Sequence, residues 1–247
     1  MVAILEASYR LLAKTEPWSA YFREAAVPPV AAVTYIFAQL QPQDAASWQR
    51  LPTRQEIVQL GKGLVAGGSA IGAVLAFAAS QGWVSAPSWG WEHTPASKVA
   101  QSIALLTTQH ILSVWQEEMV FRGYGFDTLR QAIGLPAAIV CSSLLFAIYH
   151  GFNPRMLVSM TLAGVLLSFL RLEHENLWLP FGFHLGWNLL QVVLFGPSTA
   201  NPSLRPLLVH GPAEWIGQPG YPEPGYLVTL VVAMIVGFLF LRRRRRA

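Results

Sequence analysis

Two adjacent glutamates and an arginine follow a long apolar run, and this feature restricts the fold more than any other. The run covers residues 99–114, and Glu117, Glu118 and Arg122 come shortly after it. A charged side chain at the centre of a membrane helix costs about 2.5–3.5 kcal/mol on insertion scales. Such charges are therefore paired, face the interior of a bundle, or serve a function. We expect these three side chains to lie inside a helix bundle, away from lipid.

The spacing predicts different roles for the two glutamates. Glu118 and Arg122 are four residues apart, so on a helix they share a face and can pair. Glu117 lies about 100° around the helix from Glu118 and has no partner at that spacing. We interpret Glu118 as a structural carboxylate held by arginine, and Glu117 as a free carboxylate that is available for chemistry.

Composition assigns the chain to the membrane proteins. Of its 247 residues 53% are hydrophobic and 12% are charged, whereas soluble domains carry about 25% charged residues. We therefore predict an all-α fold, a polytopic transmembrane bundle of about six to eight helices. The net charge of +4 comes from the arginines at 242–246. A nucleic-acid partner is therefore not expected, and the partners are the lipid bilayer and a protein or peptide within it.

Hydrophobic runs and turn residues divide the chain into two predicted parts. Residues 1–60 are expected to form amphipathic and short hydrophobic helices and a loop, and whether 27–40 span the bilayer stays open. Residues 61–247 are expected to form the transmembrane bundle. The predicted spans are 64–84, 99–121, 136–150, 156–172, 177–195 and 227–241.

The arginines at 242–246 predict the orientation of the chain. A basic cluster after an apolar run marks the cytoplasmic side. We therefore expect a multi-pass protein of the bacterial inner membrane with a cytoplasmic C-terminus. Alternation of the spans then places most other basic residues on the inner side, and Arg155 is the exception.

Four polar residues in apolar spans are expected to meet. Glu117 and His150 are 17 and 16 residues from the turn at Gly134, so two helical arms return them to similar depth. His184 and Asn188 share one face of a third helix. Glu117 can act as a general base toward water, while His184 and Asn188 can donate hydrogen bonds to an oxyanion. Glu117, His150 and His184 could instead bind Zn²⁺ and leave a position open for water.

These residues fall into three motifs that resemble those of the CPBP family, the CAAX-protease-like and bacteriocin-processing intramembrane endopeptidases. The segment 176–180, Asn-Leu-Trp-Leu-Pro, also resembles that family, and the resemblance covers about residues 99–195. The motifs in this chain are Glu117-Glu118-x-x-x-Arg122, Phe146-x-x-x-His150 and His184-x-x-x-Asn188.

The resemblance implies an intramembrane endopeptidase that hydrolyses a peptide bond of a membrane-associated protein or peptide. It also implies that Glu117 and His150 activate water and that His184 and Asn188 hold the oxyanion. Glu118 and Arg122 would then brace the site. The family is described both as glutamic-type and as metalloprotease. We favour the glutamic type without a tightly bound metal, and zinc is the alternative.

Two other functions are consistent with the same sequence features. One is a non-enzymatic immunity or binding protein of the same fold. The other is a proton-coupled transporter, because intramembrane Glu and His residues can conduct protons. Separately, Pro222-Glu223-Pro224-Gly225 followed by an apolar run and arginines resembles a PEP-CTERM sorting signal. We expect instead that the last span is permanent and that the mature chain retains Ala247.

Overall fold

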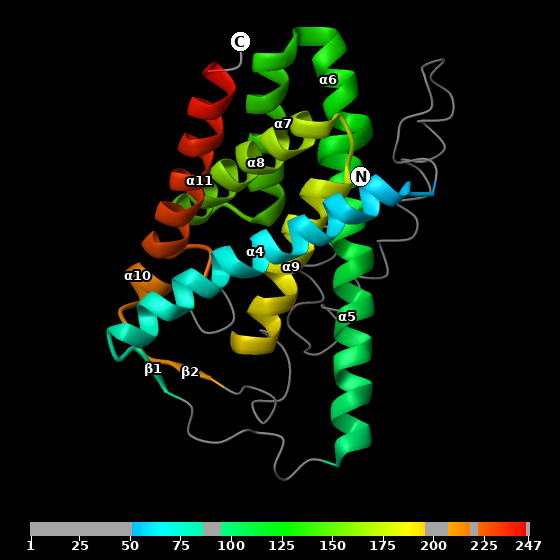
Figure 1. Cartoon of the computed structure of the whole chain (residues 1–247). Coiled ribbons are helices and arrows are strands. Elements are labelled where there is room, and N and C mark those ends of the chain that lie inside the picture. The colour runs from blue at the N-terminus through cyan, green and yellow to red at the C-terminus, as the bar shows by residue number, and fades with distance from the viewer. Residues whose placement is uncertain (1–50, 86–94, 196–206, 218–221, 246–247) are drawn as a thin grey trace, which may run out of the picture.

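The computed structural model of the chain describes residues 51–85, 95–195, 207–217 and 222–245. Expectations for residues 1–50, including the question of whether 27–40 span the bilayer, lie outside this part. The described residues are almost entirely helical (Figure 1), which confirms the all-α prediction. The elements are α4 Arg54–Ser80, β1 Val84–Ser85, α5 Ala96–Glu118, η2 Met119–Tyr124, α6 Gly125–Ile133, α7 Leu135–His150, α8 Pro154–His174, α9 Trp178–Phe195, β2 Leu208–Val209, α10 Ala213–Ile216 and α11 Tyr226–Arg244.

Helix α4 begins at Arg54, nearly three helical turns before the span expected at 64–84. Thr53 and Glu56 form a capping box at this end. The Thr53 backbone N–H donates to Glu56 Oε2 at 2.8 Å, and the Glu56 N–H donates to Thr53 Oγ1 at 3.4 Å. Because this box satisfies backbone donors at the helix start, the polar residues before 61 continue the helix, where a loop and a separate short helix were expected.

Three helices of the described part are long and apolar enough to cross a membrane, namely α4, α8 and α11. Helix α7 is apolar but shorter, with 16 residues. About 20 residues are usual for a span. Length and composition thus agree with a helical membrane protein.

Helices α4 and α9 cross at a contact made of glycines, and Figure 1 shows α4 passing in front of α9. Gly63 and Gly67 of α4 lie against the backbone of α9, and Gly182 and Gly186 of α9 lie against the backbone of α4. A side chain at any of these positions would collide with a backbone atom of the other helix. Small residues allow such close packing of membrane helices, and here they fix the rotation of α9, so that His184 points away from α4.

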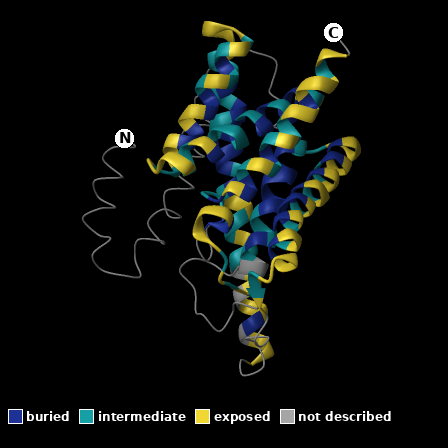
Figure 2. Ribbon diagram, turned by 90° about the vertical axis from the view of Figure 1, so that its left-hand side faces the viewer, coloured by how far each residue is buried: buried dark blue, intermediate teal, exposed yellow. Residues whose placement is uncertain are grey.

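The main core combines side chains from five helices, and Figure 2 shows buried residues concentrated where these helices meet. Helix α11 contributes Leu227, Val228, Val232 and Leu239, all of which are buried. The last span is therefore integrated into the bundle. Retention of Ala247 itself stays a prediction, because residues 246–247 lie outside the described part.

Two very short strands form a feature that the sequence did not predict. Val84 pairs with Val209 and Ser85 with Leu208 in an antiparallel arrangement. The sequence indicated only loops around these positions, because two-residue strands give no alternating pattern. The pairing joins the end of α4 to the segment that leads through α10 to α11.

Candidate active site

The segment η2 carries the first motif from α5 into α6, and its backbone is kinked at Gly123, whose φ of −90° and ψ of −113° are not helical. Glu117 and Glu118 end α5, and Arg122 lies in η2. Side chains of neighbouring helices bind backbone carbonyls of this kinked segment. Ser142 Oγ donates to the Phe121 carbonyl, and Arg171 Nε donates to the Arg122 carbonyl at 2.7 Å. The kinked segment directly follows both glutamates, and these two hydrogen bonds tie it to α7 and α8.

Glu118 is the centre of a fully buried polar group. Its Oε1 accepts a hydrogen bond from Arg122 Nη1 at 3.2 Å and lies 2.9 Å from His184 Nδ1. The guanidinium carbon of Arg122 lies 4.0 Å from the centroid of the Phe146 ring. The i, i+4 pair expected from the spacing is thus present. The contact of Glu118 with His184 was not predicted, because 66 residues separate the two positions and no local pattern relates them.

Glu117 faces the two histidines. Its Oε2 lies 3.7 Å from His150 Nε2 and 3.8 Å from His184 Nε2. Its Oε1 lies 3.4 Å from Ser113 Oγ, one turn earlier on α5. Within the described part of the chain the buried Oε2 has no hydrogen-bond partner. These separations are too long for direct hydrogen bonds, but a water molecule can bridge groups at this spacing.

Hydrogen bonds at the Nδ1 atoms orient the imidazole rings of His150 and His184. His150 Nδ1 lies 2.8 Å from the Phe146 carbonyl oxygen, which can only accept, so Nδ1 carries the proton. The Nε2 of a neutral His150 ring then presents a lone pair toward Glu117. His184 Nδ1 likewise donates to the Glu118 carboxylate, and its Nε2 faces Glu117. Second hydrogen bonds of this kind commonly select the tautomer of a working histidine.

Asn188 is the sequence-predicted site residue that the structure does not bring into direct contact with the others. It is half-buried and lies one turn beyond His184 on α9. Among the described residues its amide makes no hydrogen bond, so it is free to bind a ligand beside the cluster. The structure therefore groups Glu117, Glu118, Arg122, His150 and His184, and places Asn188 on the adjoining helix face.

A zinc site made by Glu117, His150 and His184 was the alternative from the sequence. Ligand atoms around tetrahedral zinc, each about 2.0–2.1 Å from the metal, lie roughly 3.3 Å apart. The two distances from Glu117 Oε2 to the imidazoles are 3.7 and 3.8 Å. Across the described ranges, no group of three or more His, Cys, Asp or Glu side chains has an arrangement that could hold a metal ion. The choice between a glutamic-type site and zinc stays a prediction.

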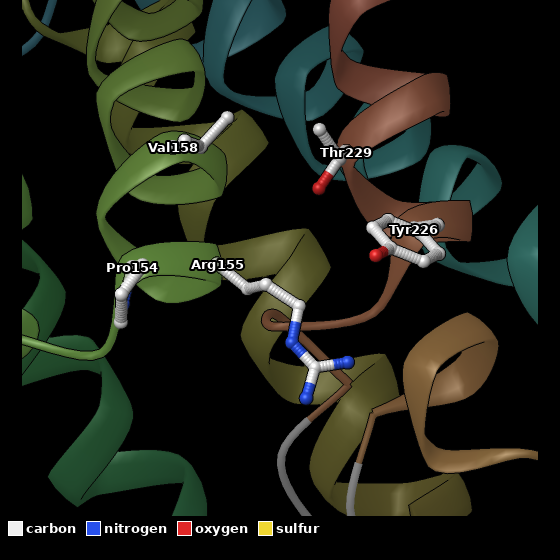
Figure 3. A pocket seen from close by; sticks show the side chains of 5 residues that line it. All are labelled: Pro154, Arg155, Val158, Tyr226 and Thr229. Carbon is white, nitrogen blue, oxygen red and sulfur yellow. The ribbon is translucent and has the colours of Figure 1, made fainter.

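A surface cleft of about 230 Å³ lies elsewhere, between the first turns of α8 and α11. Pro154, Arg155 and Val158 of α8 and Tyr226 and Thr229 of α11 line it, and Figure 3 shows Arg155 and Val158 extending toward α11. None of the candidate site residues lines this cleft. The chemistry predicted from the sequence is therefore not located there.

Residues 99–190 match the family model described as type II CAAX prenyl endopeptidase Rce1-like. Comparison with curated proteins and with solved structures gave no match. The matched segment runs from α5 to α9 and contains every candidate site residue named from the sequence. The resemblance to the CAAX-protease-like family is therefore confirmed by an Rce1-like match over residues 99–190.

Proposed function

We propose that this chain is an intramembrane endopeptidase that hydrolyses a peptide bond of a membrane-associated protein or peptide. The family match supports an endopeptidase in general terms. The observation that carries the proposal is the position of Glu117 Oε2. It is buried, has no hydrogen-bond partner in the described part of the chain, and faces the Nε2 atoms of His150 and His184.

The first step is activation of water by Glu117 and His150. One water O–H donates to Glu117 Oε2 and the other to His150 Nε2, which presents a lone pair. A lone pair of the water oxygen then faces the carbonyl carbon of the substrate. Glu117 takes a proton as the new C–O bond forms, which is general-base catalysis.

The second step is stabilisation of the tetrahedral oxyanion by His184 and Asn188. The Asn188 amide donates one hydrogen bond. His184 donates from Nε2 when both ring nitrogens carry protons, and Glu118 balances the resulting charge through Nδ1. Preorganised donors of this kind in a water-poor site give large rate effects. The proton held by Glu117 then passes to the leaving amine as the C–N bond breaks, so a carboxylic acid and an amine are released.

Glu118 and Arg122 act in this scheme by holding His184 in place. Their charges balance one another, and both side chains are inaccessible to solvent. We further propose that the protein lies in a bacterial inner membrane with its C-terminus in the cytoplasm, because the arginines at 242–246 follow the last apolar helix.

Replacement of the proposed base tests this function. Glu117→Gln keeps the shape of the side chain and removes the base, so turnover should fall about 10²–10⁴-fold. Cleavage of a mixed peptide library by purified protein, read by mass spectrometry, provides the assay. Glu214→Gln is the matched control, because Glu214 is an exposed carboxylate on α10, outside the cluster.

Near-normal cleavage by Glu117→Gln would remove Glu117 from the mechanism. Absence of cleavage by the unaltered protein would instead favour a non-enzymatic binding protein or a transporter. Thermal unfolding of both variants should resemble that of the unaltered protein, which separates loss of chemistry from loss of fold.

A further inference from the structure

Glu223 lies in a turn that is firmly held against the bundle. The Gly225 N–H donates to the Pro222 carbonyl at 2.9 Å. Gly225 also lies so close to the end of α10 that a side chain there would meet the backbone of residues 215–217. Prolines on both sides of Glu223 fix two further backbone torsions. The carboxyl group is therefore presented from a fixed turn at the start of α11.

Glu223 lies next to side chains on the face of α9 that carries His184. Burial raises the pKa of Glu223 to about 6, and its own backbone N–H, the Gln191 side chain and the charge of His184 act in the opposite direction. Oε2 is buried and has no hydrogen-bond partner among the described residues. The chain thus keeps a carboxylate beside the candidate site at a cost to folding.

The side chains on this face of α9 form a continuous polar row. His184, Asn188 and Gln191 follow one another at helical spacing and share a face. Trp187 Nε1 donates to Gln191 Oε1 at 3.0 Å, which directs the amide nitrogen of Gln191 away from Trp187. The Gln191 side chain hydrogen-bonds the Glu223 carboxyl group, so this carboxyl group lies beside the end of the row that follows Asn188.

The charges in this region are not balanced. Glu118 pairs with Arg122, whereas Glu117 and Glu223 each keep a buried oxygen that no described residue binds. An unpaired buried carboxylate is costly. A ligand with a positively charged donor would remove that cost, because charge-assisted hydrogen bonds are the stronger kind. Glu117 is assigned to water, so Glu223 is the carboxylate available to the substrate.

We propose that Glu223 is a specificity-determining residue whose carboxylate binds a lysine or arginine side chain of the substrate close to the scissile bond. This inference rests on the proposed peptidase function, and it adds the class of peptide that the site accepts. Glu223 lies outside residues 99–190, so the family match does not include it.

Cleavage of a randomised peptide library by purified full-length protein tests the proposal. Mass spectrometry of the products should show lysine and arginine enriched at one position within a few residues of the cut. In Glu223→Gln the enrichment of lysine and arginine at this position should fall by about tenfold or more. Glu223→Lys should favour glutamate at the same position. Glu214→Gln should keep the original preference. An unchanged preference in Glu223→Gln would overturn the proposal, as would cleavage without any preference for charge.

A binding measurement keeps the inference testable if the protein does not cleave peptides. The probes are a fluorescein-labelled peptide of alanine and leucine with one central lysine, and its glutamine counterpart. Glu117→Gln protein should bind the lysine peptide about tenfold more tightly than the glutamine peptide. The additional change Glu223→Gln should abolish this difference in affinity. Equal affinities for the two peptides would refute the role of Glu223, whereas absence of cleavage with preserved discrimination would refute only the peptidase function.

Discussion

Removal of the Glu118 carboxylate should damage the fold as well as the chemistry. Glu118 Oε1 binds Arg122 Nη1 at 3.2 Å and His184 Nδ1 at 2.9 Å, and neither the Glu118 nor the Arg122 side chain is accessible to solvent. In Glu118→Ala the guanidinium stays buried without its counter-charge. Two of its nitrogens, Nε and Nη2, already have no hydrogen-bond partner in the described part of the chain, and the face of the Phe146 ring at 4.0 Å does not replace a carboxylate.

The expected cost is large for a single substitution. Breaking a buried ion pair by removing one partner costs about 3–5 kcal/mol, compared with about 1 kcal/mol for an average substitution. A second change separates the unpaired charge from other causes. Glu118→Ala with Arg122→Met removes both charges and should recover most of the lost stability. Turnover should stay low in the double variant, because His184 Nδ1 still lacks its acceptor.

Unfolding in mild detergent, followed for the unaltered protein, both single variants and the double variant, gives the coupling energy as a double-mutant cycle. Library cleavage by the same four proteins gives the effect on chemistry. A stable but inactive Glu118→Ala would mean that Glu118 takes part in the reaction directly. A double variant as unstable as Glu118→Ala would show that an unpaired Arg122 is not the cause of the damage.

Two other predictions concern the metal and the contact between α4 and α9. Purified protein should lack stoichiometric zinc and keep its activity after chelation; zinc in a stoichiometric amount, lost together with activity in His150→Ala, would establish the metal alternative. Gly67→Val should destabilise the bundle by about 1–3 kcal/mol or more in detergent unfolding, because its side chain would meet the Phe183 carbonyl. Gly61→Val is the matched control on the same helix, since nothing lies within 4 Å of its added Cβ, and equal effects of the two would contradict the packing argument.

Local spacing predicted most of the helices and the approach of Glu117 to His150. The turn at Gly134 places Glu117 and His150 at nearly equal distances along two arms, and the structure brings their side chains to 3.7 Å. The end of α7 and the start of α9 agree with the sequence prediction within a residue or two. A capping box at Thr53 and Glu56 was also readable, and it would have corrected the start of α4.

Features that depend on the third dimension could not be predicted in this way. The contact of Glu118 with His184 depends on how α5 and α9 are rotated about their axes, and glycine contacts with α4 fix the rotation of α9. The kink at Gly123 is a backbone feature that hydrophobic periodicity does not encode. Glu223 was noticed as part of a sorting-like motif, but its position beside α9 follows from the packing of α11, which no local pattern encodes.

Burial of Glu223 should make the stability of the protein depend on pH in a defined direction. The pKa of this carboxyl rises from 4.5 to about 6 on folding, so between these values the folded protein binds more protons than the unfolded chain. Stability therefore falls as pH rises from about 4.5 to 6 and is constant with respect to this group outside that range. This rise in the pKa of Glu223 corresponds to a loss of about 2 kcal/mol in the free energy of unfolding at neutral pH.

Glu223→Gln cannot ionise, so it should gain stability relative to the unaltered protein as pH rises. Unfolding measured at pH values from about 4.5 to 7 should show the difference growing by about 2 kcal/mol, while Glu214→Gln shows no such trend. A difference that does not change with pH, or a Glu223→Gln protein that is less stable at neutral pH, would show that Glu223 is not a destabilising buried carboxylate. If the expected trend is found together with loss of the preference for basic peptides, the chain retains Glu223 at the expense of stability because substrate binding requires its charge.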